Sequence, residues 1–214
     1  MMKIIMPAVA FALLVVASSA FAAVIYPGES AFLGAISPGF YLEEFSGWTV
    51  GAPIPDVTGP ITDVNFGPGN GYAWHAHSLN GSLFSNTGAL STALADEASL
   101  LITFTGLPVT AMGGIFTFTD SYEQVLEGNF TLTLNDGTLI SQEGSHFIGF
   151  TSTEPLTSMI FTTNGTGDLA WPQLDHFYIG AALPPSSVPE PTTFILLAAG
   201  IGGLALLKTR RRSR

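Results

Sequence analysis

The second half of the chain is divided into short stretches rich in β-branched and aromatic residues, with turn-forming residues between them. These stretches cover residues 100–105, 115–119, 130–134, 138–140, 146–151, 158–162 and 174–179. Residues of these types favour β-strands. Asn135-Asp136-Gly137 separates two of the stretches, and Asp-Gly readily supplies the positive φ angles of a hairpin turn. The pattern therefore predicts a series of short strands that includes a hairpin.

The first half carries the same signal more weakly. The stretches that suit strands are 24–26, 40–50 and 61–66. Proline and glycine at 51–60 and 67–71 predict a loop and a turn, and only 88–97 has some helical character. About nine short strands with almost no helix predict an all-β fold, an antiparallel β-sandwich of the jelly-roll type over residues 23–180.

Apolar runs lie at both ends of the chain. Residues 1–22 combine a positive charge at Lys3, an apolar stretch, and the small residues Ala20 and Ala22 on either side of a phenylalanine. This pattern is typical of a secretory signal peptide that is cleaved after Ala22, so that the exported chain begins at Ala23. The alternative is an N-terminal membrane anchor.

The second apolar run, residues 192–207, has no charged residue and follows a short Pro/Ser linker at 181–187. Its 16 residues correspond to about 24 Å of helix, which is short for a bilayer core of about 30 Å. The basic residues that follow are Lys208, Arg210, Arg211, Arg212 and Arg214. Such an end is typical of a segment that stays in the cytoplasm. The run is therefore predicted to be a single transmembrane helix that suits temporary retention, with a buried C-terminal helix as the alternative.

Val188-Pro189-Glu190-Pro191 lies between the linker and the apolar run. Proline fixes φ and disfavours helix at the residue before it, so this segment is expected to be extended. With the apolar run and the basic end, residues 188–214 resemble the PEP-CTERM sorting signal of Gram-negative bacteria. The resemblance implies recognition by an exosortase of the inner membrane and export to the cell surface or an exopolysaccharide matrix. The strands within 98–180 are similar to the closing strands of sandwich domains common in such cargo, which supports the fold alone.

Charge is distributed very unevenly along the chain. Between Lys3 and Lys208 there is neither lysine nor arginine, and of the 16 acidic residues all but Glu190 of the Pro-Glu-Pro segment lie in the body. Such a body repels nucleic acid and anionic membranes, and its charge either attracts divalent cations or serves solubility. There is no cysteine, and therefore no disulfide framework. The separation of charge supports a topology with the body outside and the basic tail inside.

Two histidines are spaced for a shared site. His75 and His77 point to the same face of a strand, so both rings can reach one metal, with Asp63 or Asp56 as a third ligand from a neighbouring strand. A surface pair of histidines without metal is the alternative. Asp175, in the last strand, is a candidate structural calcium ligand by analogy with some jelly-roll modules. No other cofactor is indicated.

Aromatic residues suggest a carbohydrate site. Asn164, Asp168 and Trp171 lie on one irregular segment, where binding residues often occur, and they combine a stacking ring with groups that bond to hydroxyls. The other aromatic candidates for stacking are Trp48, Tyr72, Trp74 and Tyr122. Packing in the core is the alternative for most of the tryptophans.

Four Thr-x-Thr pairs suggest a further possibility. They are Thr103/Thr105, Thr117/Thr119, Thr131/Thr133 and Thr151/Thr153, and the first three are 14 residues apart. Rows of such pairs on a flat sheet would order water and bind ice or a polysaccharide. The alternative is that threonine is a good strand former on a solvent-exposed face, where a strand–turn–strand repeat produces the same spacing.

Catalysis has little support in the sequence. There is no Gly-x-Ser-x-Gly motif, no cysteine nucleophile, and no lysine or arginine in the body to stabilise an oxyanion. We therefore expect a non-catalytic surface or matrix protein, without catalytic residues, whose partners are an exosortase and extracellular polysaccharide. The alternative is a secreted hydrolase of that polysaccharide, which would need a pair of carboxylates that the sequence does not reveal.

Overall fold

The computed structural model describes residues 23–46, 61–86, 88–93, 99–120, 124–164 and 170–184. The predicted signal peptide, residues 185–187 of the linker and the whole sorting signal lie outside these residues. So do four side chains named as candidates for binding, which are Trp48, Asp56, Tyr122 and Asp168. Within the described residues, no helix has the length and apolar character that crossing a bilayer requires.

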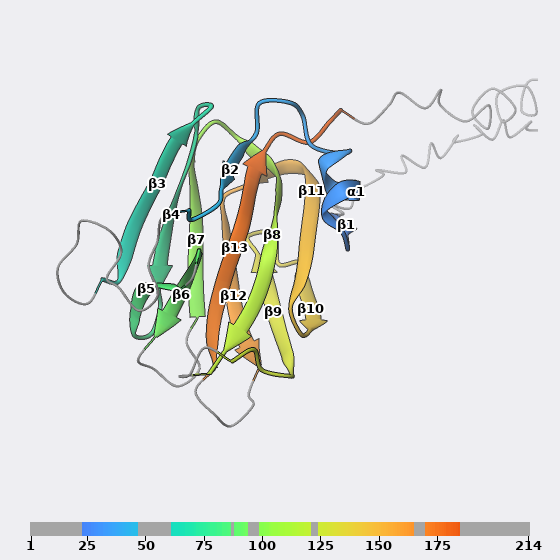
Figure 1. Ribbon diagram of the computed structural model, residues 1–214. Coiled ribbons are helices and arrows are strands. Elements are labelled where there is room, and N and C mark those ends of the chain that lie inside the picture. Colours follow the sequence, from blue (N-terminus) through green and yellow to red (C-terminus); the bar gives the residue numbers. More distant parts are fainter. Residues whose placement is uncertain are drawn as a thin grey trace, which may run out of the picture.

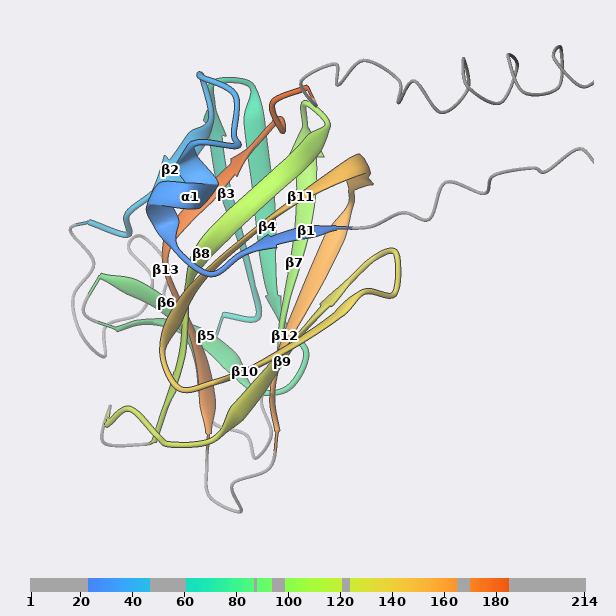
Figure 2. The same ribbon diagram turned by 90° about the vertical axis from the view of Figure 1, so that its right-hand side faces the viewer.

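The described strands form two antiparallel sheets that pack face to face (Figures 1 and 2). The six-stranded sheet contains, from edge to edge, β10 (Leu139–Glu143), β9 (Asn129–Leu134), β12 (Ser158–Asn164), β7 (Ser99–Gly106), β4 (Tyr72–Ser78) and β3 (Asp63–Gly69). The seven-stranded sheet contains β1 (Val24–Tyr26), β11 (His146–Leu156), β8 (Val109–Thr119), β13 (Trp171–Gly180), β6 (Ala89–Ala93) and β5 (Ser82–Asn86), with β2 (Tyr41–Glu43) also paired to β13. The prediction of an all-β antiparallel fold is confirmed.

Eight of these strands have the order of a jelly roll. In one sheet the order is β6-β13-β8-β11, and in the other it is β7-β12-β9-β10. The chain changes sheet at every step from β6 to β13, except at the β9–β10 hairpin. This hairpin is the one that Asp136-Gly137 predicts, and Gly137 has a φ of 86°. Because consecutive strands lie in different sheets, residues that are regularly spaced in the sequence are separated in the structure.

The expectation of helical character at 88–97 is wrong for Ala89–Ala93, which form β6, while residues 94–97 lie outside the described residues. Leu90 of β6 is fully buried and lies opposite Leu174 of β13, while the strand pairs with β5 on its other side. Backbone pairing on both sides and burial outweigh the modest helix propensity of an alanine- and leucine-containing segment.

The two sheets enclose an aromatic core. Phe66 and Trp74 stack at a centroid distance of 4.0 Å, and Phe116 meets Phe161 edge-on at 5.4 Å. Trp74 is 1% exposed and Tyr72 is 8% exposed. Both therefore belong to the core, and the expectation that they stack against sugars is wrong.

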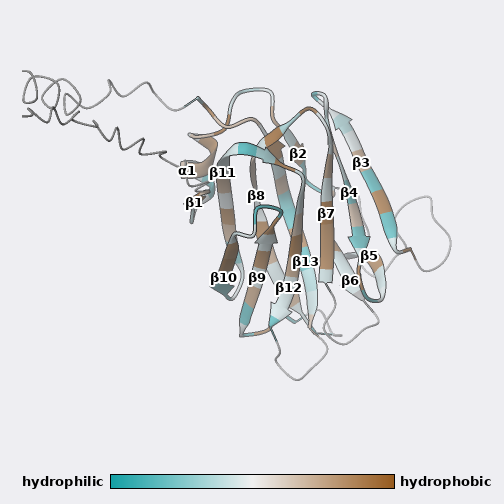
Figure 3. Ribbon diagram, turned by 180° about the vertical axis from the view of Figure 1, so that it is seen from behind, coloured by the Kyte–Doolittle hydropathy of each residue, from teal (hydrophilic) through white to brown (hydrophobic). Residues whose placement is uncertain are grey.

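A second, smaller cluster covers part of the outer face of the seven-stranded sheet. It is built on α1 (Glu29–Leu33), whose Phe32 is fully buried. Phe32 lies over Gly149 of β11, which faces Gly113 of β8 in the register of the sheet. The hydroxyl of Tyr178 donates a hydrogen bond to Glu29 at the start of the helix. By contrast, no described helix covers the outer face of the six-stranded sheet (Figure 3).

Candidate functional site

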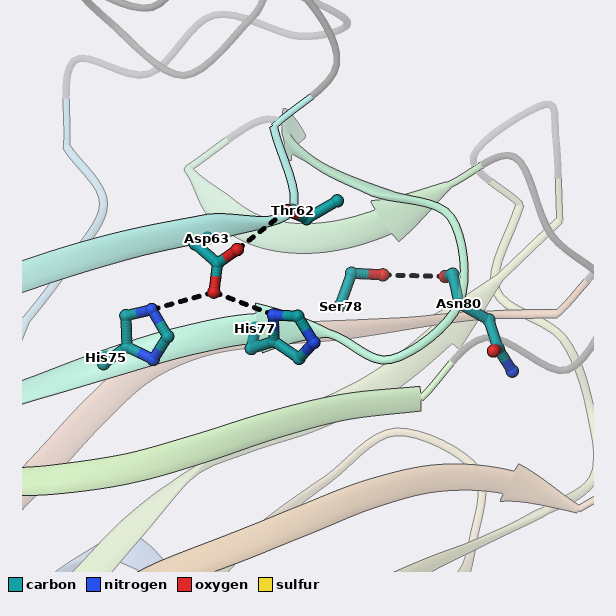
Figure 4. Close-up of polar contacts among 6 residues, drawn as sticks. All are labelled: Thr62, Asp63, His75, His77, Ser78 and Asn80. Atoms are coloured by element: carbon teal, nitrogen blue, oxygen red, sulfur yellow. Dashed lines mark hydrogen bonds and ion pairs between the residues drawn. The ribbon is translucent and has the colours of Figure 1, made fainter.

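The two histidines of β4 meet Asp63 of the neighbouring strand β3 on the outer face of the six-stranded sheet (Figure 4). Inward-facing Trp74 and Ala76 alternate with them, so both imidazoles point outward, as their spacing predicts. One carboxylate oxygen, Oδ1 of Asp63, lies 3.1 Å from Nε2 of His75 and 2.8 Å from Nδ1 of His77. The two rings are nearly parallel, with centroids 6.4 Å apart. We call these three residues the His–Asp–His cluster.

Hydrogen bonds to Asp63 stabilise its ionised form. The hydroxyl of Thr62 donates to Oδ2 at 2.7 Å, while His77 faces Oδ1. These two contacts, the hydroxyl first and the imidazole second, lower the pKa of the Asp63 carboxyl below its ordinary value. The side chain of Asp63 is half exposed, so water screens this interaction.

The cluster does not have the geometry of a metal site as it stands. No group of three His, Cys, Asp or Glu residues among the described residues is arranged to hold a metal ion. Within the cluster, the oxygen of Asp63 lies at the point on which both ring nitrogens converge. Asp175, the proposed calcium ligand, lies on β13 in the other sheet, where its Oδ1 accepts a hydrogen bond from the backbone N–H of His176 at 2.6 Å. The structure therefore brings Asp63 to the histidine pair and leaves Asp175 elsewhere.

We expect the pKa of Asp63 to rise towards its ordinary value in Thr62→Val and also in His77→Asn. Valine keeps the shape of threonine but removes the donor, and asparagine removes the imidazole. Because folding lowers this pKa, the interaction stabilises the fold above the ordinary aspartate pKa, and this contribution is lost as the pH falls through the lowered value. Carboxyl ¹³C shifts recorded against pH measure the effect. His146→Asn, on the other sheet, serves as the control, and an Asp63 pKa that is the same in all four proteins would contradict the assignment.

Hydroxyl groups form a row across the same outer face. The row runs through Ser141, Thr131, Thr162 and Ser99, which are opposite one another on β10, β9, β12 and β7. Thr131 and Ser141 are hydrogen-bonded at 3.0 Å, and Ser99 and Thr162 at 3.2 Å. Asn164 donates to the hydroxyl of Thr131 at 2.6 Å. The row therefore presents neutral donors and acceptors in two hydrogen-bonded groups, one around Thr131 and the other formed by Ser99 and Thr162.

The next row of the sheet is more apolar. It runs through Leu139, Thr133, Ile160, Leu101, His77 and Asp63, from β10 to β3. Leu139 is 67% exposed. A third row contains Ser158, Thr103, His75 and Asn65. We call these three rows together the outer face; the only carboxylate within them is Asp63, at one edge of the sheet.

The predicted carbohydrate segment is divided between the sheets. Asn164 ends β12 and borders the outer face, where it lies next to the hydroxyl row, whereas Trp171 begins β13 in the seven-stranded sheet. There Trp171 meets Phe84 edge-on at 6.0 Å. The amide of Asn164 donates to Thr131 of its own sheet, and Asp168 lies outside the described residues.

The Thr-x-Thr pairs do not form one surface. Thr103/Thr105 and Thr131/Thr133 lie on β7 and β9 of the six-stranded sheet, with β12 between them. The other two pairs lie on β8 and β11 of the seven-stranded sheet, where Thr117 and Thr119 are buried. A period of 14 residues moves the chain from one sheet to the other, so the array that ice binding requires is absent from these four pairs.

Sequence reasoning missed most of the hydroxyl row. Ser99, Ser141 and Thr162 belong to three strands that are distant in the sequence, and only the register brings them together. The sequence does indicate which residues of a strand point outward, because polar residues alternate with core residues, as Thr131 does between Phe130 and Leu132. The alternation predicts which side chains of a strand face outward, but it does not predict which strands lie beside it.

Comparison with known proteins identifies the end of the chain. Residues 187–212 match the family model described as the PEP-CTERM protein-sorting motif. No curated protein and no solved structure matches the chain. The match confirms the resemblance that the tail shows, while any activity of the body has to be argued from its own geometry.

Proposed function

We propose, from the premise that this chain is an exported protein sorted through a PEP-CTERM motif by an exosortase, that its sandwich is a non-catalytic module that binds extracellular polysaccharide. The observation that carries the proposal is the outer face, which presents hydroxyl rows beside an apolar row. The chain would reach the cell surface or its polysaccharide matrix after a transient stay in the inner membrane.

The chemistry of the outer face suits a sugar polymer. Hydroxyl and amide groups such as Thr131 and Asn164 can exchange their hydrogen bonds with sugar hydroxyls. The exposed side chain of Leu139 and the partly exposed side chain of Ile160 offer apolar contact to the C–H groups of a sugar ring. Away from Asp63 at the β3 edge, the three rows contain no carboxylate, so a sugar that binds there does not desolvate a negative charge. Because the remainder of the body is acidic, an uncharged polysaccharide fits better than an anionic one.

The spacing of carboxylates on this side of the sheet supports binding without hydrolysis. Asp63 lies on the edge strand β3, and Glu143 lies on β10 at the opposite edge. Five inter-strand steps of about 4.8 Å place them on the order of 24 Å apart. Pairs of carboxylates in glycosidases are about 5–9.5 Å apart, so these two do not form such a pair.

We expect Ile160→Glu to weaken polysaccharide binding about tenfold, equivalent to about 1.4 kcal/mol, because it places a charge in the centre of the face. Val125→Glu is the matched control, since Val125 is 59% exposed and lies outside the three rows. An array of neutral and uronic-acid-containing polysaccharides, followed by titration of the strongest binder, measures the effect. Equal binding by both variants would exclude the outer face, and release of reducing sugars would favour the hydrolase instead.

A further inference from the structure

The two ends of the described body are fixed beside each other. At the N-terminal end, β1 pairs with β11, with Val24 opposite Thr151. At the C-terminal end, the backbone N–H of Leu183 donates to the carbonyl of Ala35 at 2.8 Å, and that of Ala182 donates to the hydroxyl of Thr110 at 2.8 Å. Hydrogen bonds thus hold both ends to the seven-stranded sheet. Figure 2 shows β1 and the end of the described chain on this side of the body.

A groove of about 450 Å³ lies between these ends. Its walls are β1, Thr110, residues 151–153 and residues 182–184, and we call it the chain-end groove. Hydroxyl groups of β11 line one side, while Val24 and Leu183 leave apolar surface exposed, at 53% and 43% of their areas. Strand β1 is also the edge of its sheet, so one side of its backbone has no neighbouring strand among the described residues.

The position of this groove in the chain limits what can cover it. The described body ends at Pro184, and the sorting motif begins at residue 187. Three residue steps span at most about 10 Å, at about 3.3–3.6 Å per residue. An enzyme that holds the motif therefore lies next to the chain-end groove, because the connecting chain is too short to separate them.

We propose that the chain-end groove docks on the exosortase while the sorting motif is bound, so that the folded body contributes to substrate recognition. Exposed apolar side chains at a mixed polar rim, together with a free strand edge, are features that suit a protein partner. The lipid surface is the less suitable partner, since a body that lacks lysine and arginine and carries acidic residues is repelled by anionic lipid headgroups. The inference rests on the sorting motif and is independent of polysaccharide binding.

The test compares two leucines in the full-length chain. Leu183→Glu places a charge at the groove and is expected to slow processing about fivefold in a pulse–chase experiment. A loss of this size is typical of an interface residue that contributes to binding. Leu139→Glu makes the same change at a residue that is 67% exposed on the opposite sheet, and processing should keep its normal rate. Equal rates for wild type and both variants would overturn the proposal. Resistance of each body to protease shows that the fold is retained.

A second measurement identifies the partner directly. A photo-crosslinking amino acid at position 183 should give an adduct with the exosortase, and the same amino acid at position 139 should not. If position 183 instead crosslinks only to lipid, and the released body sediments with phosphatidylglycerol vesicles, membrane contact replaces exosortase docking and the proposal fails. Loss of polysaccharide binding in Leu139→Glu, with normal processing, would separate this inference from the proposed function.

Discussion

Replacing Pro189, Glu190 and Pro191 with alanine is expected to abolish processing, so that uncut protein accumulates in the inner membrane. These residues lie within the segment that matches the PEP-CTERM protein-sorting motif. The two prolines disfavour helix, whereas alanine has the highest helix propensity. The substitution therefore removes the recognised side chains and raises the helix propensity of a segment that is expected to be extended. Fractionation of cells and immunoblotting for the cut and uncut forms measure the result.

The control for this experiment is a proline just outside the motif. Pro185→Ala changes a residue that precedes the matched segment by two positions and should be cut at the normal rate. The body of the triple mutant should unfold at the same temperature as the wild type, because none of the three residues belongs to the described sandwich. Normal release of the triple mutant would show that sorting does not depend on the motif.

The strands of the second half were predictable because each contains enough β-branched and aromatic residues for its composition to indicate a strand. Phe130, Leu132 and Leu134 alternate with threonines, and all three are buried. The neighbours of each strand were not predictable, because pairing depends on contacts between distant parts of the chain. Helix α1 was missed because its five residues carry no periodic signal. Packing of Phe32 against the sheet, rather than local propensity, stabilises it.

The His–Asp–His cluster shows the same limit at a single site. The i, i+2 spacing of His75 and His77 predicts a shared face, which is local information. The choice between Asp63 and Asp56 as the third member required the register of β3 against β4, where Asp63 lies opposite His77. A sequence can thus nominate the members of a cross-strand cluster but cannot select among them.

The second large effect is expected from Phe32→Ala, which should destabilise the body by about 3–5 kcal/mol. Phe32 is fully buried, and its ring has Tyr26, Phe147 and Tyr178 as neighbours at 5.7–6.1 Å. A Cβ added to Gly149 would lie 2.4 Å from Cδ2 of Phe32. The ring therefore occupies space that exists only because β11 has glycine at this position.

A double-mutant cycle tests this interpretation through the melting temperature of the released body. Gly149→Ala alone should cost about 1–3 kcal/mol from overpacking. It should cost less in the Phe32→Ala background, where the two closest ring atoms are removed and the Cβ of residue 32, at 2.8 Å, remains. Gly28→Ala is the control, because nothing lies within 4 Å of a Cβ built there. Additive costs for Phe32 and Gly149 would show that they do not share this space. Since the segment after α1 binds the C-terminal end through Ile36 and Ala182, Phe32→Ala should also loosen the chain-end groove and slow processing, although it changes no exposed residue.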